Sequence, residues 1–291
     1  MEPVFDIESL LARKRRAARI ADEGAAFLMQ RAAEDLADRL SAVERRFEKG
    51  AALFSTTDAA ARVMAQSGKV ASVARVEVEA GQTGFDGITA VPETLPFEPE
   101  SIDLAVSLYA LHEMNDVPGM LVQIRRALRP DGLFLGCMAG NGTLAELREA
   151  LLVAETELYG GASPRVFPFT DVRDAGGLLQ RAGLALPVAD LETVTVRYDS
   201  MFGLVRDLRA MGATNVLVQR GRKPASKALF RRAAEIYAER FSDPDGRVRA
   251  TFATIWLSGW APHASQQKPL KPGSGQVSLA KVLGKGGSET P

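Results

Sequence analysis

The stretch LPFEPESIDLAVSLYALHEMNDVPGMLVQIRRALRPDGLFLGCM, residues 95–138, decides the fold class. Within it, residues 102–108 form a short apolar run, which predicts a strand buried on both faces. Residues 116–128 begin with a capping aspartate and an early proline and continue with apolar residues at helical spacing, which predicts a helix. The RPDG turn at 129–132 precedes a second apolar strand at 133–138. Two buried strands joined by a helix form a parallel crossover unit, so the stretch predicts an α/β protein.

The rest of the chain supplies the elements of a doubly wound, seven-stranded, mostly parallel sheet with added helices. Apolar and β-branched runs predict strands at 51–54, 70–78, 88–90, 102–108, 133–138, 191–198 and 248–256. Helical spacing and capping residues predict helices at 6–47 (with a break near Gly24), 58–66, 116–128, from 143 onward, 171–183, 200–211 and 224–241. Thr143 and Glu146 have the spacing of a capping box.

Composition along the chain suggests three segments. Residues 1–48 form an N-terminal helical segment, and residues 49–262 form the sheet domain, with helical insertions at about 141–183 and 200–241. Residues 263–291 carry prolines, glycines and lysines without an apolar period, which predicts a flexible tail.

The overall composition excludes several classes of function. Basic and acidic residues number 36 each, so no bulk charge indicates nucleic acid or an acidic membrane as a partner. The single cysteine, Cys137, lies in a predicted buried strand; with only two histidines in the chain, a disulfide framework and a metal site are not expected. No apolar run approaches a membrane span, and the N-terminus resembles neither a signal peptide nor a presequence, so we expect a cytoplasmic protein.

Several motifs resemble a known family. The segments IDLAVSLYALHEMND (102–116) and IRRALRPDGLFL (124–135) are similar, at this spacing, to the second half of a class I S-adenosylmethionine-dependent methyltransferase domain of type 11. A narrower group is also similar: the bacterial relatives of the methyltransferase-like assembly factor of respiratory complex I, itself related to the malonyl-carrier methyltransferases of the biotin pathway. The segments that carry this likeness are GASPRVFPFTDVRDAGGLLQRAG (161–183), VRYDS (196–200), RDLRAMG (206–212) and GWAPHASQQKPLKPGS (259–274). The resemblance implies a Rossmann-like methyltransferase fold, S-adenosylmethionine as cofactor and a respiratory-chain subunit as a protein partner.

The resemblance also implies where the cofactor would bind, at the carboxyl ends of the strands. The family's glycine-rich turn corresponds to residues 53–60, LFSTTDAA, which contain no glycine. Positive φ is costly at the β-branched threonines of this segment, so the turn is degenerate. The cofactor-binding positions that the resemblance implies are Phe54, Ser55, Thr56 and Asp58 in the turn, Glu77 (or Glu79) for the ribose, Val91 and Glu93 for the adenine, and Ser107 and Leu108 at the end of the fourth strand.

Candidate catalytic residues follow the fourth strand. Tyr109 and His112 would line the place where cofactor and acceptor meet in a relative. His112 would accept a proton or cap the strand-to-helix turn, and the neighbouring Asn115 and Asp116 favour the turn. One basic patch precedes the sheet domain, and a solvated helix face is favoured over an acidic partner for it; its members are Arg13, Lys14, Arg15, Arg16 and Arg19.

Two functions are therefore compatible with the sequence. One is an S-adenosylmethionine-dependent methyltransferase acting on a small-molecule or protein acceptor, since such catalysis is mainly positioning and needs little acid–base machinery. The other is a non-catalytic relative, a pseudoenzyme that serves as an assembly factor or binding scaffold. Loss of the glycine turn favours the second function, and the resemblance favours the first.

Overall fold

The computed structural model describes residues 2–79, 84–221 and 224–267, so most of the segment predicted to be a flexible tail lies outside the described residues. Seven strands form one sheet in the order β3-β2-β1-β4-β5-β7-β6. The strands are β1 (Phe47–Leu53), β2 (Val70–Glu77), β3 (Asp86–Thr89), β4 (Ile102–Leu108), β5 (Leu128–Ala139), β6 (Ala185–Tyr198) and β7 (Val248–Trp260). The predicted doubly wound sheet is confirmed.

The pairing of the strands is parallel except at β7. β1 pairs in parallel with both β2 and β4, so the direction of winding reverses between β1 and β4. β7 runs antiparallel to β5 and to β6, so the sheet is mostly parallel, as predicted. The reversal beside β1 leaves a crevice at the carboxyl ends of the strands, where ligands of such sheets bind.

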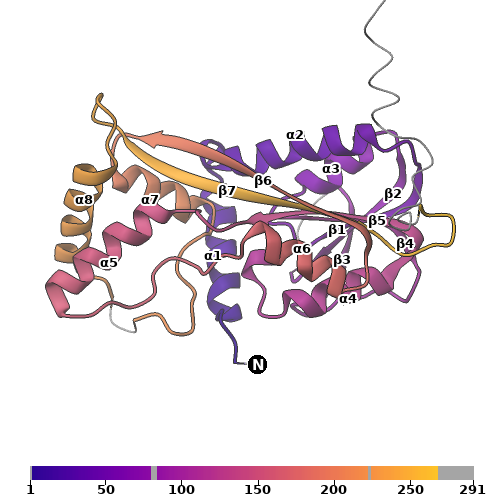
Figure 1. The fold of residues 1–291 in the computed structure, drawn as a ribbon, viewed down its shortest axis with the longest axis horizontal. Helices are drawn as coiled ribbons and strands as arrows, with labels where there is room; N and C mark the ends of the chain where they lie inside the picture. The colour runs from indigo at the N-terminus through magenta and orange to yellow at the C-terminus, as the bar shows by residue number, and fades with distance from the viewer. Residues whose placement is uncertain (1, 80–83, 222–223, 268–291) are drawn as a thin grey trace, which may run out of the picture.

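Helices cover both faces of the sheet (Figure 1). The helices are α1 (Ile7–Ile20), η1 (Glu23–Ala26), α2 (Phe27–Ala42), α3 (Ala59–Gln66), η2 (Leu111–Glu113), α4 (Val117–Ala127), α5 (Ala145–Tyr159), α6 (Val172–Arg181), α7 (Met201–Ala210) and α8 (Lys227–Phe241). Helices α2 and α3 lie on one face, and α4 and α6 lie on the other. Among the described residues, no helix combines the length and the apolar character needed to cross a bilayer.

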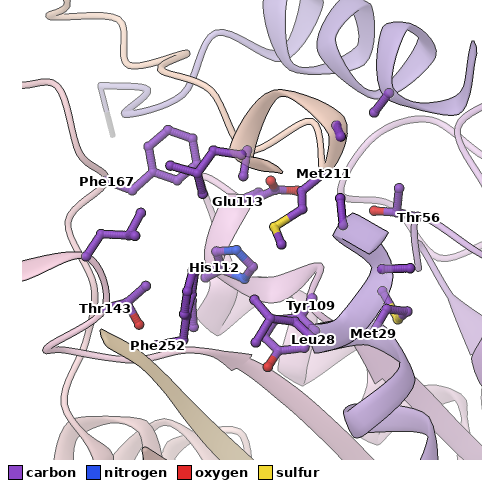
Figure 2. A pocket seen from close by; sticks show the side chains of 18 of the residues that line it. Leu28, Met29, Thr56, Tyr109, His112, Glu113, Thr143, Phe167, Met211 and Phe252 are labelled. Carbon is purple, nitrogen blue, oxygen red and sulfur yellow. The ribbon is translucent and has the colours of Figure 1, made fainter. Parts of the chain in front are cut away.

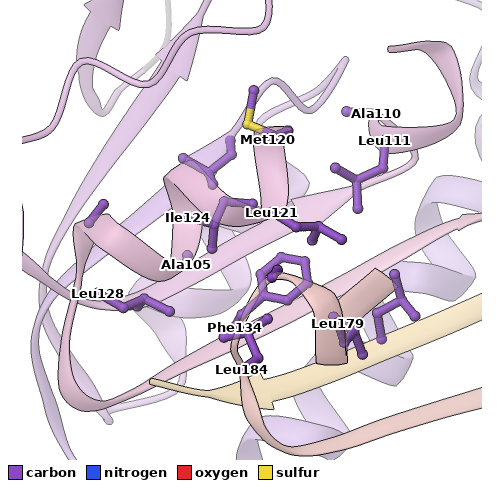
Figure 3. Packing of buried hydrophobic residues seen from close by; sticks show 14 of the residues in the cluster. Ala105, Ala110, Leu111, Met120, Leu121, Ile124, Leu128, Phe134, Leu179 and Leu184 are labelled. Carbon is purple, nitrogen blue, oxygen red and sulfur yellow. The ribbon is translucent and has the colours of Figure 1, made fainter. Parts of the chain in front are cut away.

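The alternation of side chains along β4 builds a separate core on each face of the sheet. Ala105 packs with α4 and α6, whereas Leu104 and Val106 pack with α2 and α3. Figure 3 shows the first of these cores, the cluster that joins Met120, Leu121 and Ile124 of α4 to Phe134 and Leu179. Burial on both faces explains why this strand reads as a continuous apolar run.

A third core lies beyond the sheet. β6 and β7 extend past the other strands toward α5, α7 and α8, and α1 stands between this helical group and the parallel strands (Figure 1). The cluster joins α5, α7 and α8 to the far end of β7 through residues such as Leu147, Leu204, Tyr237 and Phe252. The arrangement places α1 directly over the carboxyl-end crevice.

Several local predictions were wrong. The helix predicted over 6–47 ends at Ala42, and β1 and β6 begin at Phe47 and Ala185 rather than at residues 51 and 191. β5 begins at Leu128 rather than at residue 133, because residues 129–132 form an irregularity within the strand instead of a turn before it. Thr143 and Glu146 do not form a capping box: the Thr143 hydroxyl donates to the Ala253 carbonyl, and the Glu146 carboxylate accepts from the backbone N–H of Thr251. Hydrogen bonds to β7 therefore replace the local cap.

Candidate functional site

Two adjacent cavities lie at the carboxyl ends of the parallel strands, beside α1. The smaller has a volume of about 260 Å³ and the larger about 510 Å³. Ala18, Thr56 and Glu113 line both cavities, so the two spaces share a wall. Two ligands bound there would meet at this wall.

The smaller cavity contains several residues that the resemblance assigned to the cofactor. The loop after β1, the end of β2, the segment before β4 and the residues after β4 enclose it, and α1 closes it. Phe54, Thr56, Glu77 and Glu93 lie in its lining. Four separate segments of sequence therefore meet at the expected place.

The turn after β1 adopts the backbone conformation that glycine usually provides. Phe54 has a φ of 52°, in the left-handed region that non-glycine residues rarely occupy. The sequence suggested that positive φ would fall on the threonines, whereas Thr56 and Thr57 follow it as exposed residues. Phe54 itself is buried, and its ring takes space beside the smaller cavity.

Glu77 ends β2 with its carboxylate in the smaller cavity. Its Oε1 lies 2.7 Å from Nε of Arg75, and only 19% of its side chain is exposed. Burial raises the pKa of Glu77 to about 7, although the charges of Arg75 and Lys14 oppose this shift. The carboxyl group therefore changes its protonation state near neutral pH. Glu79, the alternative ribose acid, instead pairs with Arg15 of α1.

Glu93 has a structural role at the edge of the smaller cavity. Its φ is 58°, and its two carboxylate oxygens accept hydrogen bonds from the backbone N–H groups of Asn115 and Asp116, at 2.6 and 3.0 Å. These bonds fix the turn that follows β4. Glu93 therefore satisfies the backbone there, a role that its position in the sequence did not indicate.

Three of the proposed cofactor positions face the interior instead of a cavity. The Ser55 hydroxyl accepts a hydrogen bond from the Leu108 N–H, and the Ser107 hydroxyl donates to the Leu53 carbonyl. All three, Ser55, Ser107 and Leu108, are almost completely buried and line neither cavity. The side chains of Ser107 and Leu108, which the resemblance implied as cofactor-binding positions, therefore do not reach either cavity. The hydrogen bonds of the Ser55 and Ser107 hydroxyls hold the ends of β1 and β4 together.

Two further positions also lie outside both cavities. Val91 is 69% exposed, so its side chain encloses no ligand space. Asp58 precedes α3 and pairs with Arg62 at 2.6 Å along the helix surface. Neither is placed to hold a cofactor in this arrangement.

The larger cavity lies between the sheet and the helical group. Figure 2 shows His112 in the middle of its lining, with Phe167 and Thr143 on one side and Thr56 and Met29 on the other. Most of the lining is apolar. Its larger apolar members include Leu28, Met29, Leu144, Phe167, Phe169 and Phe252.

Both candidate catalytic residues line the larger cavity. Tyr109 has a φ of 51°, and its hydroxyl lies 2.6 Å from the Thr254 hydroxyl. His112 lies in η2 against the rings of Tyr109 and Phe169. Its Nδ1 is buried without a hydrogen-bond partner among the described residues, so this nitrogen does not cap the turn as the sequence suggested. Burial lowers the pKa of His112, which keeps the imidazole neutral.

Glu113 and Lys14 are site residues that sequence reasoning missed. The buried Glu113 carboxylate lies 2.6 Å from Lys14 Nζ, at the wall between the cavities. Lys14 belongs to the basic patch that was expected to be a solvated helix face, and Arg15 of the same patch pairs with Glu79. That expectation was therefore wrong for Lys14, whereas Arg15 is exposed, as expected. The one signal in the sequence was the position of Glu113, directly after Leu111 and His112 in the segment that follows the fourth strand.

Comparisons with known proteins identify the relatives of this chain. Residues 49–136 match the family described as "Methyltransferase domain". Human "Arginine-hydroxylase NDUFAF5, mitochondrial" is 42% identical over 200 residues, which cover 67% of this chain and 56% of that protein. "Malonyl-[acyl-carrier protein] O-methyltransferase" of Laribacter hongkongensis is 35% identical over 181 residues, which cover 62% of this chain and 58% of that protein.

The solved structures support the fold. The BH2331 protein of Bacillus halodurans C-125 superposes with a TM-score of 0.54 at 14% identity, covering 79% of this chain and 100% of that chain. The chain spans 43% of the Dictyostelium discoideum relative and 56% of the human one. Sequence similarity over part of a relative does not assign the activity of the whole relative to this chain. The matched domain, the sheet order and the relatives together place this chain in the class I S-adenosylmethionine-dependent methyltransferase family.

Proposed function

We propose that the chain binds S-adenosylmethionine in the smaller cavity and presents it to an acceptor held in the larger one. The observation that carries the proposal is the position of Glu77, a carboxylate at the end of β2 inside a cavity that borders the larger one at Thr56 and Glu113. A carboxylate there suits the two ribose hydroxyls, which donate hydrogen bonds.

The residues present fit the cofactor in polarity. Glu77 would accept from the ribose, and Thr56 stands where the cofactor's methionine part would approach the acceptor. When bound, the cofactor supplies an already activated methyl group. The protein's own contribution is then positioning and exclusion of water, for which a buried, mainly apolar acceptor cavity is suited.

The direct test is isothermal titration of the protein with S-adenosylmethionine and with S-adenosylhomocysteine. We expect dissociation constants in the micromolar range, and Glu77→Ala should weaken binding by at least tenfold because both ribose hydroxyls lose their acceptor. Glu98→Ala, at an exposed position before β4, is the matched control and should bind as the wild type does. Absence of heat at millimolar ligand would reject the proposal.

The acceptor and the partners are also matters of proposal. The human and Dictyostelium relatives are named arginine hydroxylases, and the Laribacter relative is named a carrier-protein methyltransferase, so a protein or a protein-bound group is a reasonable acceptor class. A respiratory-chain subunit is the partner that the motif resemblance implies. The curated names place the first relatives in mitochondria, and a cytoplasmic setting for this chain rests on its composition alone.

A non-catalytic scaffold is the second candidate function, and one observation favours it. The Phe54 ring borders the smaller cavity where the family has glycine, and Arg75 already pairs with Glu77. Both features compete with a cofactor. A scaffold would show no cofactor binding and would retain a protein partner, so the cofactor titration separates the two functions. Pull-down with the protein and with an Arg13→Glu, Arg16→Glu variant then tests whether the exposed α1 surface binds that partner.

A further inference from the structure

The larger cavity has the size and the lining of a small-molecule site. Its volume of about 510 Å³ lies within the range of ligand pockets, roughly 300–1,000 Å³. Aromatic and aliphatic side chains from α2, α5, β7 and the segment before α6 enclose it, including Leu28, Leu147, Phe167 and Phe252. Such a lining favours an apolar occupant, because removing apolar surface from contact with water lowers the free energy.

Most polar side chains of the lining are already satisfied by the protein. The Tyr109 and Thr254 hydroxyls bond to each other, and the Thr143 hydroxyl bonds to both the N–H and the C=O of Ala253. Arg165 forms a bidentate pair with Glu155, at 2.6 and 2.9 Å. These groups have little left to offer a ligand.

Charge within the cavity is similarly compensated. Glu113 pairs with Lys14 at the wall shared with the smaller cavity, and Arg165 pairs with Glu155. The remaining lining acids, Asp22 and Glu23, are exposed at η1, where water screens them. A permanently charged ligand group would therefore lose its hydration without gaining a buried counter-charge.

His112 is the exception. Part of its ring is accessible in the cavity, and its buried Nδ1 has no partner among the described residues. The neutral imidazole offers one donor and one acceptor. Because Nδ1 is buried, a ligand would reach the imidazole through Nε2, which has no hydrogen-bond partner among the described residues and is not buried.

We propose that the larger cavity binds an uncharged, apolar acceptor group that carries one neutral hydrogen-bonding head, and that His112 positions this head. The ligand class is therefore an acyl, alkyl or aryl group ending in a hydroxyl or amide, and not a guanidinium or another cation. The assignment of this ligand as the acceptor rests on the proposed function, whereas its binding does not. His112 acts as a positioning residue.

The test uses two probes of equal chain length, 1-octanol and octylguanidinium, titrated calorimetrically into the full chain. We expect 1-octanol to bind at least tenfold more tightly than octylguanidinium. Equal affinity, or tighter binding of the cation, would overturn the proposal and would indicate that Asp22 and Glu23 recognise a cationic acceptor. This comparison requires no variant, so it stands even where a substitution prevents folding.

Three variants assign the head-binding role. His112→Phe keeps an aromatic ring but removes both nitrogens, and it should weaken 1-octanol binding about fivefold, as expected for one hydrogen bond. His112→Gln, which retains a neutral donor and acceptor, should restore most of that loss. Val122→Ala, exposed on α4, is the control and should bind as the wild type. Unchanged 1-octanol affinity in His112→Phe would refute a role for His112.

The outcome is separable from that of the proposed function. S-adenosylhomocysteine is titrated into the same preparations, so cofactor binding is read independently. Octanol binding without cofactor binding would support the apolar ligand site and reject the methyltransferase proposal. Cofactor binding without octanol binding would support the methyltransferase proposal and reject the apolar ligand site.

Discussion

Glu77 is the residue whose titration should be visible in the stability of the protein. Its folded-state pKa of about 7 lies above the ordinary value of 4.5, because burial disfavours the charged form. The folded state then binds a proton more tightly than the unfolded state. The associated stability is complete below about pH 4.5 and is lost as pH rises through 7, with a size on the order of 1–3 kcal/mol.

Glu77→Gln tests this linkage because the amide cannot titrate. Urea unfolding of both proteins at pH 5 and pH 8 should show the wild type losing stability relative to the variant by about that amount. Glu98→Gln, at an exposed site, should track the wild type at both values. Parallel pH profiles for Glu77→Gln and the wild type would mean that the carboxyl is ionised throughout.

Phe54 provides a second test at the residue scale, because its backbone conformation favours glycine whereas its buried position favours a large apolar side chain. Removing the buried ring should destabilise the protein by about 3 kcal/mol in Phe54→Ala. At a φ of 52°, Phe54→Gly avoids the steric cost of a Cβ, which is about 1–2 kcal/mol. We therefore expect Phe54→Gly to be more stable than Phe54→Ala by about 1 kcal/mol in urea unfolding. The usual order, alanine above glycine, would contradict strain in this turn.

At the scale of elements, α1 is held over the cavities by ion pairs as well as by apolar packing. Lys14→Met leaves the Glu113 carboxylate buried without its cation, where only 8% of the acid's side chain is exposed. We expect a loss of about 1–3 kcal/mol, reduced from the value for a fully buried pair because Lys14 is 22% exposed. The added change Glu113→Gln should recover much of this loss in a double-mutant cycle.

The neighbouring pair supplies the matched control. Arg15 and Glu79 are both about half exposed, so Arg15→Met should cost clearly less stability than Lys14→Met does. Both variants are measured by urea unfolding at pH 7. Equal costs for the two pairs would show that burial of Glu113 does not matter to the attachment of α1.

Elements were predictable from the sequence where side-chain periodicity alone decides them. The apolar run of β4, the helical spacing of α4 and the capping aspartates at 116 and 171 all gave the observed structure. Prediction failed where distant partners decide. Thr143 and Glu146 have a local capping pattern, but β7 offers their side chains hydrogen bonds that no local pattern shows.

The position of the candidate site was also predictable in outline, because strand order alone decides which segments meet there. Strand order places Glu77, Thr56 and Tyr109 at one edge of the sheet, and this much follows from a strand-by-strand alignment to the family pattern. Side-chain direction does not follow, since Ser107 points toward β1 while Tyr109 faces the larger cavity. The partner of Glu113 was also hidden, because Lys14 lies far away in sequence on a helix that reads as solvated.

At the scale of the whole molecule, the sheet, the helical group and α1 meet around both cavities. Ala18, Thr56 and Glu113 line the two spaces together, and Lys14 holds α1 at their border. A ligand in either cavity therefore packs against the same helix and restrains it. The second ligand then meets a wall that is already ordered, so the free-energy cost of ordering α1 falls on the first ligand alone.

This shared wall predicts positive coupling between cofactor and acceptor ligands. We expect saturating S-adenosylhomocysteine to lower the dissociation constant of 1-octanol about fivefold, and saturating 1-octanol to lower that of S-adenosylhomocysteine by the same factor, because coupling free energy is reciprocal. Calorimetric titration in both orders measures the two factors. Lys14→Met loosens α1 and should change the coupling more than Arg15→Met does, since the Arg15 pair lies at the exposed rim of the smaller cavity alone. Two ligands that bind independently in both orders would show that α1 is already fixed before either ligand arrives, and the two cavities would then act as separate sites.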